Sequence, residues 1–550
     1  MNRLLGRPVI LPRPRLAAGV LVASLLLVFV LWPVLRVLWA SLAGPAGPSL
    51  AGYREFFGSR RLLGILINSL VMAGLSTVLT VLLALILAYA MTRTTVPGKR
   101  LISLVAWWPL VSPPFLAALA LILLFGRDGA AGRWLGHEWS IYGVHGIVIA
   151  QVFTFLPQAW MLLVRVLADI DPSLEEAAEN LAARPLDVLR RVTLALARPG
   201  LASAALIVFV LCLSDFANPF LVGGHFTVLA TEIYARVIRA NDLPGAATLS
   251  VILFLPCLLA SVFNARWIGA WPGAFTGAAA PPTALRPTPP ALRWPLAAVT
   301  VSVVLLTGVV YGLIVLASFV RLWGSDWSLG LAHYRFAATG AGAWAVWNSL
   351  ELAVLSGVVG TALALPTAYL LEWKRASLAS GARVIEGLGL LAAALPGTVL
   401  GVGYLLAFDV PSLPAAGTMW ILVASVVFWT LPGAVGTGVA ALRRLDPAIE
   451  EAAVSLGAGP ARTVRRILAP LLTGTALSLF VYFFVNGMVT VSAVIILVSP
   501  HFSPASVAVL AQAANGLPGA ACALATILVS VVVGTVVAAR AFLGPDRPPS

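Results

Sequence analysis

The sequence predicts an all-α polytopic membrane protein, with about twelve transmembrane helices in two parallel six-helix repeats. The chain of 550 residues is 60% hydrophobic and 10% charged, with a mean hydropathy of +0.99. A water-soluble domain needs far more polar surface than this composition supplies. One acidic phrase also occurs twice, as DPSLEEAAENLA at 171–182 and DPAIEEAAVSLG at 446–457. The repetition indicates an internal duplication.

The first half, residues 1–271, contains six apolar runs of roughly 20 residues, the length that a helix needs to cross a bilayer. These runs lie near 16–40, 66–91, 101–125, 146–167, 200–222 and 248–270. The first run is too long for the apolar core of a signal peptide, so we expect it to remain as the first helix.

A flexible cytoplasmic linker is predicted at 272–293, because this segment is rich in Pro, Ala and Gly and has no helical periodicity. The second half, 294–550, repeats the plan of the first. Its apolar runs lie near 294–318, 347–371, 386–408, 418–441, 474–498 and 519–543. An Asn-Ser-Leu triplet opens the second run of each half, at Asn68 and at Asn348. Since each half has an even number of spans, the duplication is parallel.

The formal charge of +14 indicates membrane orientation rather than nucleic-acid binding. If the N-terminus is cytoplasmic and the spans alternate, cytoplasmic segments hold 25 of the 35 Lys and Arg residues. External segments then hold nine, and Arg36 lies within the first span. This asymmetry follows the positive-inside rule and predicts that both termini are cytoplasmic.

The repeated phrase opens two predicted cytoplasmic loops, 171–198 and 446–473, each between the fourth and fifth spans of its half. Asp171 and Asp446 precede proline, as a helix N-cap precedes proline at the first helical position. Ser173 with Glu176 offers an alternative capping box in the first copy. Carboxylates in the early turns complement the helix dipole. A break of small residues and a basic helix with an Arg-Arg pair follow.

A single copy of such a loop would also suit an amphipathic linker lying on the membrane surface. The two copies share their Asp-Pro caps, their break prolines (Pro185 and Pro460) and their Arg-Arg pairs. We therefore favour two equivalent docking elements for a two-fold symmetric partner inside the cell.

At these residues the sequence resembles the membrane subunit of a type I ABC importer, whose signature is a cytoplasmic Glu-Ala-Ala loop followed by a glycine. The resemblance implies a fused permease in which each loop holds a coupling helix that sits in a groove of an ATPase subunit. The residues it assigns to ATPase coupling are Glu175, Glu176, Ala177, Ala178, Leu181, Ala182, Glu450, Glu451, Ala452, Ala453, Leu456 and Gly457.

The first copy departs from that signature because Ala182 stands where the second copy has Gly457. Alanine adopts a positive φ less readily than glycine. If the two loops couple unequally, we therefore expect the first to be the weaker.

Within this family, the chain resembles the branch that imports ferric iron or 2-aminoethylphosphonate. Thr231-Glu232-Ile233-Tyr234 is similar to both groups, and the stretch from Tyr482 to Leu510 is most similar to the aminoethylphosphonate permeases. The resemblance thus implies a small solute, with a 2-aminoethylphosphonate-like phosphonate first and ferric iron second.

The chain is not expected to be an enzyme, because neither lysine lies in the glycine-rich frame that holds nucleotide phosphates. No spacing of Cys, His, Asp or Glu indicates a metal or nucleophile site. We therefore expect no cofactor on this chain, with ATP and Mg bound by the partner. The expected partners are two copies of an ABC ATPase, a periplasmic or lipoprotein solute-binding protein and membrane lipid, and no nucleic acid.

Polar residues inside the spans suggest a translocation path, because polar side chains at this depth are costly. The candidates are Asp215, Asn218, Asn486, Thr490 and Ser492, which would face one another across a pseudo-two-fold axis. Hydrogen bonding between helices is the alternative role for these side chains.

The sequence thus favours a permease of the inner membrane that works by alternating access. A secondary transporter of two six-helix halves, driven by an ion gradient, is the alternative. That class would not need the paired loops.

Overall fold

The computed structural model describes residues 13–44, 47–97, 99, 101–102, 108–127, 129–135, 140–268, 290–373, 381–410 and 413–543. This part of the chain is mainly helical, which confirms the all-α prediction. Its strands form three short antiparallel hairpins. These are β1 (Ala43–Gly44) with β2 (Gly47–Pro48), β3 (Val320–Leu322) with β4 (Asp326–Leu329), and β5 (Asp409–Val410) with β6 (Leu413–Pro414).

The helices follow the order of the predicted spans. The first half contains α1 (Arg13–Leu26), η1 (Leu27–Leu31), α2 (Trp32–Ser41), α3 (Ala51–Gly58), α4 (Arg60–Arg93), η2 (Trp108–Val111), α6 (Leu116–Phe125), α7 (Ala130–Leu135), α8 (Val144–Ala168), α9 (Pro172–Asn180), α10 (Pro185–Val188), η3 (Leu189–Thr193), α11 (Leu194–Ser214), α12 (Ala217–Val222), α13 (Leu229–Ile238), α14 (Leu243–Phe263) and η4 (Asn264–Ile268). The second half contains α15 (Pro290–Phe319), α16 (Ala332–Ala338), α17 (Gly340–Trp373), α18 (Gly381–Ala394), α19 (Gly397–Phe408), α20 (Met419–Leu442), α21 (Pro447–Ser455), α22 (Pro460–Thr463), η6 (Val464–Leu468), α23 (Ala469–Leu471), α24 (Thr473–Val489), α25 (Ala505–Ala514) and α26 (Pro518–Leu543).

Eleven of the twelve predicted spans have a counterpart among the described residues. Nine are single helices long and apolar enough to cross a membrane, and two are helix pairs bent by 112° and 64°. The remaining span, predicted at 101–125, includes residues 103–107, which lie outside the described part. Of the predicted linker, 272–289 lies outside it as well, and 290–293 forms the first turn of α15.

The two halves match element by element. α9, α10 and η3 of the first half each lie 275 residues before α21, α22 and η6 of the second. Both η3 and η6 are five-residue π-helices that contain an Arg-Arg pair and lead into the fifth span. The duplication inferred from sequence therefore extends to an uncommon local geometry, the π-helical turn.

The fifth span of each half ends earlier than the apolar run predicts. α11 ends at Ser214 because Asp215 has extended dihedral angles, and the chain resumes as the short helix α12. α24 likewise ends before Thr490, and the apolar residues 491–498 form turns rather than helix. Hydropathy alone predicted one continuous helix in both places.

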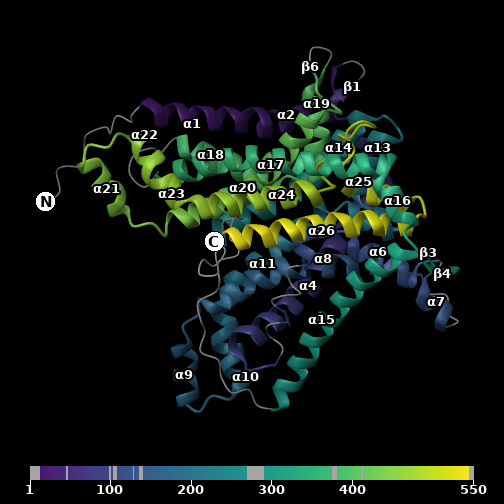
Figure 1. Cartoon of the computed structure of the whole chain (residues 1–550), viewed down its shortest axis with the longest axis horizontal. Coiled ribbons are helices and arrows are strands. Elements are labelled where there is room, and N and C mark those ends of the chain that lie inside the picture. The colour runs from purple at the N-terminus through teal and green to yellow at the C-terminus, as the bar shows by residue number, and fades with distance from the viewer. Residues whose placement is uncertain are drawn as a thin grey trace.

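The halves exchange their first helices. α1 packs against α17 and α18 of the second half, and α15 packs against α4 and α6 of the first. Figure 1 shows α1, in purple, beside the green helices, and α15, in teal, beside the blue ones. Two side-chain hydrogen bonds join the exchanged segments to the opposite half. Arg36 Nε donates to the carbonyl of Leu406 at 3.0 Å, and Trp323 Nε1 donates to the carbonyl of Leu123 at 2.8 Å.

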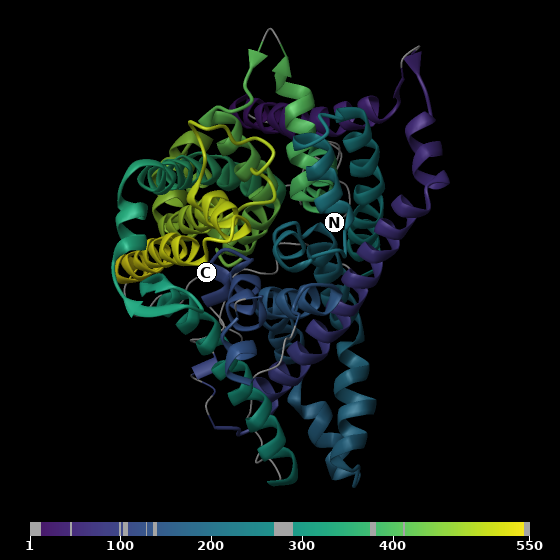
Figure 2. The same ribbon diagram turned by 90° about the vertical axis from the view of Figure 1, so that its right-hand side faces the viewer.

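The last helix of each half also packs against the third span of the other. α14 contacts α18 and α19, while α26 contacts α6 and η2. A view turned by 90° shows the green and yellow helices of the second half at the upper left, with blue helices of the first half below and to the right of them (Figure 2). One buried apolar cluster, with members from Val22 to Ala525, runs through both halves.

Candidate functional site

The two repeated loops begin with the same cap. The Asp171 carboxylate accepts a hydrogen bond from the backbone N–H of Ser173 at 2.9 Å, and Asp446 accepts one from Ala448 at 2.9 Å. The bonds from Ser173 lower the pKa of Asp171, which is fully exposed. The cap is therefore the aspartate, and the alternative based on Ser173 is not the one formed. Each cap lets a short helix, α9 or α21, start directly after its span ends.

Both short helices end in the same left-handed turn. Ala182 has a φ of 61° and Gly457 a φ of 76°. The next residue of each loop, Ala183 or Ala458, donates its N–H to a carbonyl five residues back, at 3.1 and 2.9 Å. This is the hydrogen-bond pattern of a Schellman motif. Ala182 thus reaches the conformation that glycine adopts more readily, at a cost of about 1–2 kcal/mol.

The tips of these loops expose large apolar side chains. Leu181 is 85% exposed and Leu456 is 87% exposed, more than most large apolar residues of the described chain. Glu176, Ala177, Glu451 and Ala452 are exposed beside them, whereas Ala178 is half-buried and Ala453 is buried. The side chain of Glu450 lies outside the described part. A leucine left in water forgoes about 1.5–3 kcal/mol of burial, so these tips suit an apolar groove on a partner.

Glu175 lies inside the first half rather than on its surface. Its Oε1 is 3.2 Å from Arg93 Nε and accepts a hydrogen bond from the Thr193 hydroxyl at 2.7 Å. Arg93 also donates to the carbonyls of Leu167 and Ile170, at 2.8 and 3.0 Å. We call Arg93, Glu175 and Thr193 the latch. It fastens α9 to the ends of α4 and α8 and to η3, so Glu175 positions the loop and does not face a partner.

The latch was missed by sequence reasoning. The sequence analysis assigned Glu175 to ATPase coupling and singled out neither Arg93 nor Thr193. The second half carries Trp373 at the end of α17, the helix that corresponds to α4, and Leu468 where the first half has Thr193. The two copies therefore differ at the positions of Arg93 and Thr193, and a comparison of the copies would have revealed the difference.

Asp215 and Asn218 belong to one buried network at the break between α11 and α12. The Asp215 carboxylate accepts hydrogen bonds from Gln151 at 3.0 Å and from the Asn218 side chain at 2.9 Å. Asn218 also donates to the Thr154 hydroxyl at 3.4 Å. Gln151 and Asn218 each leave a buried amide oxygen without a hydrogen-bond partner among the described residues.

The polar residues of the second half bond within that half. The side-chain amide of Asn486 donates to the carbonyl of Tyr482 at 2.8 Å, and the carbonyl of Thr490 accepts from Ser506 at 2.8 Å. Ser492 lies against Gly397, where an added Cβ would be 2.9 Å from that of Ser492. In the described chain no hydrogen bond joins this set to Asp215 or Asn218. α12, which contains Asn218, contacts α25 of the second half.

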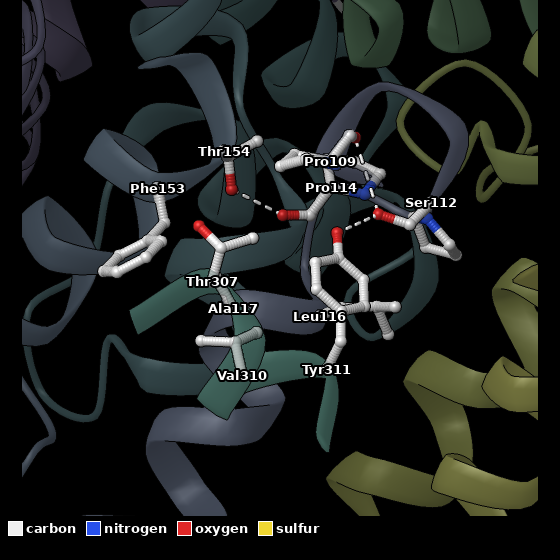
Figure 3. Close-up of a pocket in the computed structure, with 11 residues that line it drawn as sticks. Pro109, Ser112, Pro114, Leu116, Ala117, Phe153, Thr154, Thr307, Val310 and Tyr311 are labelled. Carbon is white, nitrogen blue, oxygen red and sulfur yellow. Dashed lines mark hydrogen bonds between the residues drawn. The ribbon is translucent and has the colours of Figure 1, made fainter. Parts of the chain in front are cut away.

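A small pocket lies where the third span of the first half breaks, next to α15 of the second half. Figure 3 shows Ser112 directed at Tyr311, to which it is hydrogen-bonded, and Thr154 directed at the carbonyl of Pro114, 2.6 Å away. The cavity measures about 20 Å³, room for about one water molecule. Its other lining residues are Pro109, Pro113, Leu116, Ala117, Phe153, Thr307 and Val310.

The break in each third span is held from the same position on the fourth span. Thr154 bonds the carbonyl of Pro114 in the first half, and Trp429, 275 residues later, donates to the carbonyl of Leu395 at 3.2 Å in the second. Each break leaves one backbone carbonyl without its hydrogen bond within the helix. A side chain of α8 or α20 donates to that carbonyl instead, because an unpaired backbone group is costly in the apolar environment of a bilayer. Sequence reasoning identified the prolines but not these partners.

The described residues contain no group of three or more His, Cys, Asp or Glu side chains placed to hold a metal ion. The loops thus offer exposed surfaces suited to docking. The helix breaks offer points of bending and weak polar contacts.

Comparison with known proteins gives matches along most of the chain. The family described as "Binding-protein-dependent transport system inner membrane component" matches residues 80–268, a range that includes the first repeated loop and the latch. The chain is 31% identical over 507 residues to the ferric transport system permease protein FbpB of Actinobacillus pleuropneumoniae, covering 90% of this chain and 73% of that protein.

Two further relatives differ in extent. The chain is 33% identical over 451 residues to the putative ferric transport system permease protein FbpB 1 of Haemophilus influenzae, covering 79% of this chain and 70% of the relative. A shorter match, 26% identical over 231 residues, is to the putative 2-aminoethylphosphonate transport system permease protein PhnU of Salmonella typhimurium. That match covers 40% of this chain and 81% of the relative.

Proposed function

This chain belongs to the family of fused, two-half permease subunits of binding-protein-dependent ABC importers, and on that premise we propose that the solute it passes is ferric iron. Family membership makes it a multi-pass protein of the inner membrane that is not itself an enzyme. It also excludes the alternative of a secondary transporter driven by an ion gradient.

The observation that supports the substrate proposal is the large share of this chain that the two ferric relatives match. Each is at least 31% identical and is matched over at least 79% of this chain. The phosphonate relative is matched over 40% of this chain. The stretch from Tyr482 to Leu510 favoured a phosphonate over ferric iron. We now place ferric iron first, because similarity along both halves has more weight than a local motif. 2-Aminoethylphosphonate is the second candidate.

The proposed partners are two ATPase subunits and a periplasmic or lipoprotein solute-binding protein, with both termini of the chain in the cytoplasm. Each of α9 and α21 then enters a groove on one ATPase subunit. The exposed leucines at the tips, Leu181 and Leu456, support this assignment, as does the carboxylate next to each Ala-Ala pair. The nucleotide and its Mg belong to the ATPase, and this chain needs no cofactor.

We propose that the permease works by alternating access. Closure of the ATPase dimer draws α9 and α21 together, and η3 and η6 pass this displacement to the fifth spans. The broken third and fifth spans offer hinges at Pro114, Leu395, Asp215 and Thr490. We propose that Asp215, Asn218, Asn486, Thr490 and Ser492 line the path once the halves separate. The unpartnered amide oxygens of Gln151 and Asn218 support this, since water or solute would satisfy them.

The test is reconstitution of the permease with its ATPase and receptor in proteoliposomes. The expected result is ATP-dependent uptake of radioactive ferric iron delivered by the receptor, with no uptake when an ion gradient replaces ATP. ATP-dependent uptake of 2-aminoethylphosphonate without iron uptake would contradict the substrate and leave the class of transporter intact.

A further inference from the structure

The two halves differ at the end of the molecule opposite α9 and α21. Figure 1 places α13 and α25 at the right, away from these two helices. In the first half this end carries five arginines and three carboxylates on α3, the start of α4, and the segment from α13 to Asp242. We call this set the arginine patch. Its members are Arg54, Glu55, Arg60, Arg61, Glu232, Arg236, Arg239 and Asp242.

Ion pairs hold the arginine patch together. Arg61 donates two hydrogen bonds to Glu232, at 3.0 and 2.9 Å, although its own side chain is 65% exposed. Arg236 lies 2.8 Å from Asp242, 3.5 Å from Glu55 and 4.0 Å from Glu232. These pairs tie α13 to α3 and α4, so the surface is formed by one connected network rather than by independent side chains.

Three arginines of the patch remain available for a partner. Arg54, Arg60 and Arg239 are exposed and have no acidic partner among the described residues. The five arginines outnumber the three carboxylates by two, so the surface is positively charged.

The second half has almost no charge at the corresponding place. There the elements are α16 (AHYRFAA), the first turn of α17 (GAGA) and α25 (ASVAVLAQAA). Arg335, at the position of Arg54, is the one residue among Lys, Arg, Asp and Glu in these three segments. The duplication supplied both halves with the same helices, and only the first half bears the charged network.

We propose that the arginine patch is the docking surface for one lobe of the solute-binding protein, and that this lobe presents carboxylates. The inference rests on the proposed function for the existence of that partner. An acidic surface complements the unpaired arginines, and a neutral surface suits α16 and α25. Because the two faces differ, a two-lobed receptor binds in one orientation only.

The test uses the full complex of permease and ATPase in nanodiscs of zwitterionic lipid, titrated with the cognate receptor. The variant is Arg60→Glu/Arg239→Glu, and the matched control is Arg335→Glu on the second half. Reversal of the two charges is expected to raise the receptor Kd by about tenfold at low salt, with a smaller salt dependence than the wild type. The control is expected to change the Kd by less than about twofold.

The outcomes separate the two proposals. An unchanged Kd for the double variant, or an equal loss with Arg335→Glu, overturns the docking surface. A parallel set of nanodiscs contains anionic lipid. If reversal leaves receptor binding intact but removes a stabilisation of the complex by that anionic lipid, the patch binds headgroups and the proposal is overturned. A wild-type complex that binds no receptor at any salt concentration overturns the function as well. Receptor-dependent uptake of a solute other than iron leaves the docking surface standing.

Discussion

Arg93 Nε lies 3.2 Å from Glu175 Oε1, and the two side chains are 2% and 4% exposed. The pair joins the C-terminal end of α4 to α9, the first of the two proposed coupling helices. A buried ion pair does not add much stability over an apolar pair of the same shape, but the loss of one partner leaves the other charge buried and unpaired. Breaking this contact between α9 and the rest of the first half therefore costs considerable free energy.

Glu175→Gln and Arg93→Met are each expected to destabilise the first half, by about 3–5 kcal/mol for the loss of one partner of a buried pair. The measurement is thermal unfolding of the detergent-solubilised permease. The matched control is Glu372→Gln, which removes the more exposed pair with Arg443. That change is expected to cost less than about 1 kcal/mol. Equal shifts for the three variants would contradict the role of the latch.

The latch also predicts a loss of coupling. Glu175→Asp preserves the charge and shortens the side chain by one methylene, so its carboxylate reaches Arg93 less well. We expect receptor-stimulated ATP hydrolysis to fall while basal hydrolysis by the complex persists. A proportional fall in both activities would indicate general unfolding rather than loosened coupling.

Ala182→Gly is expected to stabilise the first coupling loop, by up to about 1 kcal/mol, because glycine adopts a φ of 61° without a Cβ clash. The reciprocal change, Gly457→Ala, is expected to destabilise the second loop by a similar amount, since Gly457 has a φ of 76°. The Cβ of an alanine at 457 would meet no atom within 4 Å, so backbone strain is the sole contribution. Thermal unfolding of both variants checks this, and shifts of the same sign would be inconsistent with it.

Leu456→Asp and Leu181→Asp are expected to weaken association with the ATPase by tenfold or more, on the order of 1.5–3 kcal/mol of lost apolar burial for each leucine. Glu451→Arg is expected to act in the same direction. Because these side chains are exposed, expression and unfolding temperature should not change. Co-purification of the ATPase is the measurement, with Leu517→Asp as control at the opposite end, where Leu517 is 54% exposed. Full ATPase retention by the Leu456 variant would refute this docking role.

Acid is expected to loosen the first coupling helix at its cap. The hydrogen bonds from Ser173 lower the pKa of Asp171 from its ordinary 3.8. A carboxylate whose pKa is lower in the folded state contributes stability above the ordinary pKa and loses it as the pH falls through the folded value. Hydrogen exchange at the amides of residues 173–176 should therefore show extra opening below pH 3.8, and Asp171→Asn should show no such step. Equal pH dependence in both proteins would contradict the cap.

Local sequence features predicted the membrane class and the repeated loops because each depends on short stretches of chain. The spans follow from apolar runs, and the coupling helices follow from Asp-Pro caps and early glutamates. The same reasoning failed where the backbone leaves the helix within an apolar run. The runs 200–222 and 474–498 each predict one continuous helix, yet α11 ends before Asp215 and α24 ends before Thr490, where the backbone is extended.

Sequence alone thus determined that the chain is a duplicated, all-α membrane protein with two matching loops, since composition, periodicity and repetition are properties of the chain itself. Tertiary structure decided that Glu175 is a latch rather than a docking residue and that the first helices are exchanged between halves. It also showed that Thr154 and Trp429 satisfy the breaks in the third spans. These features join residues far apart in the chain, and whether a carboxylate is exposed or paired depends on which helix lies next to it, a relationship that no local pattern records.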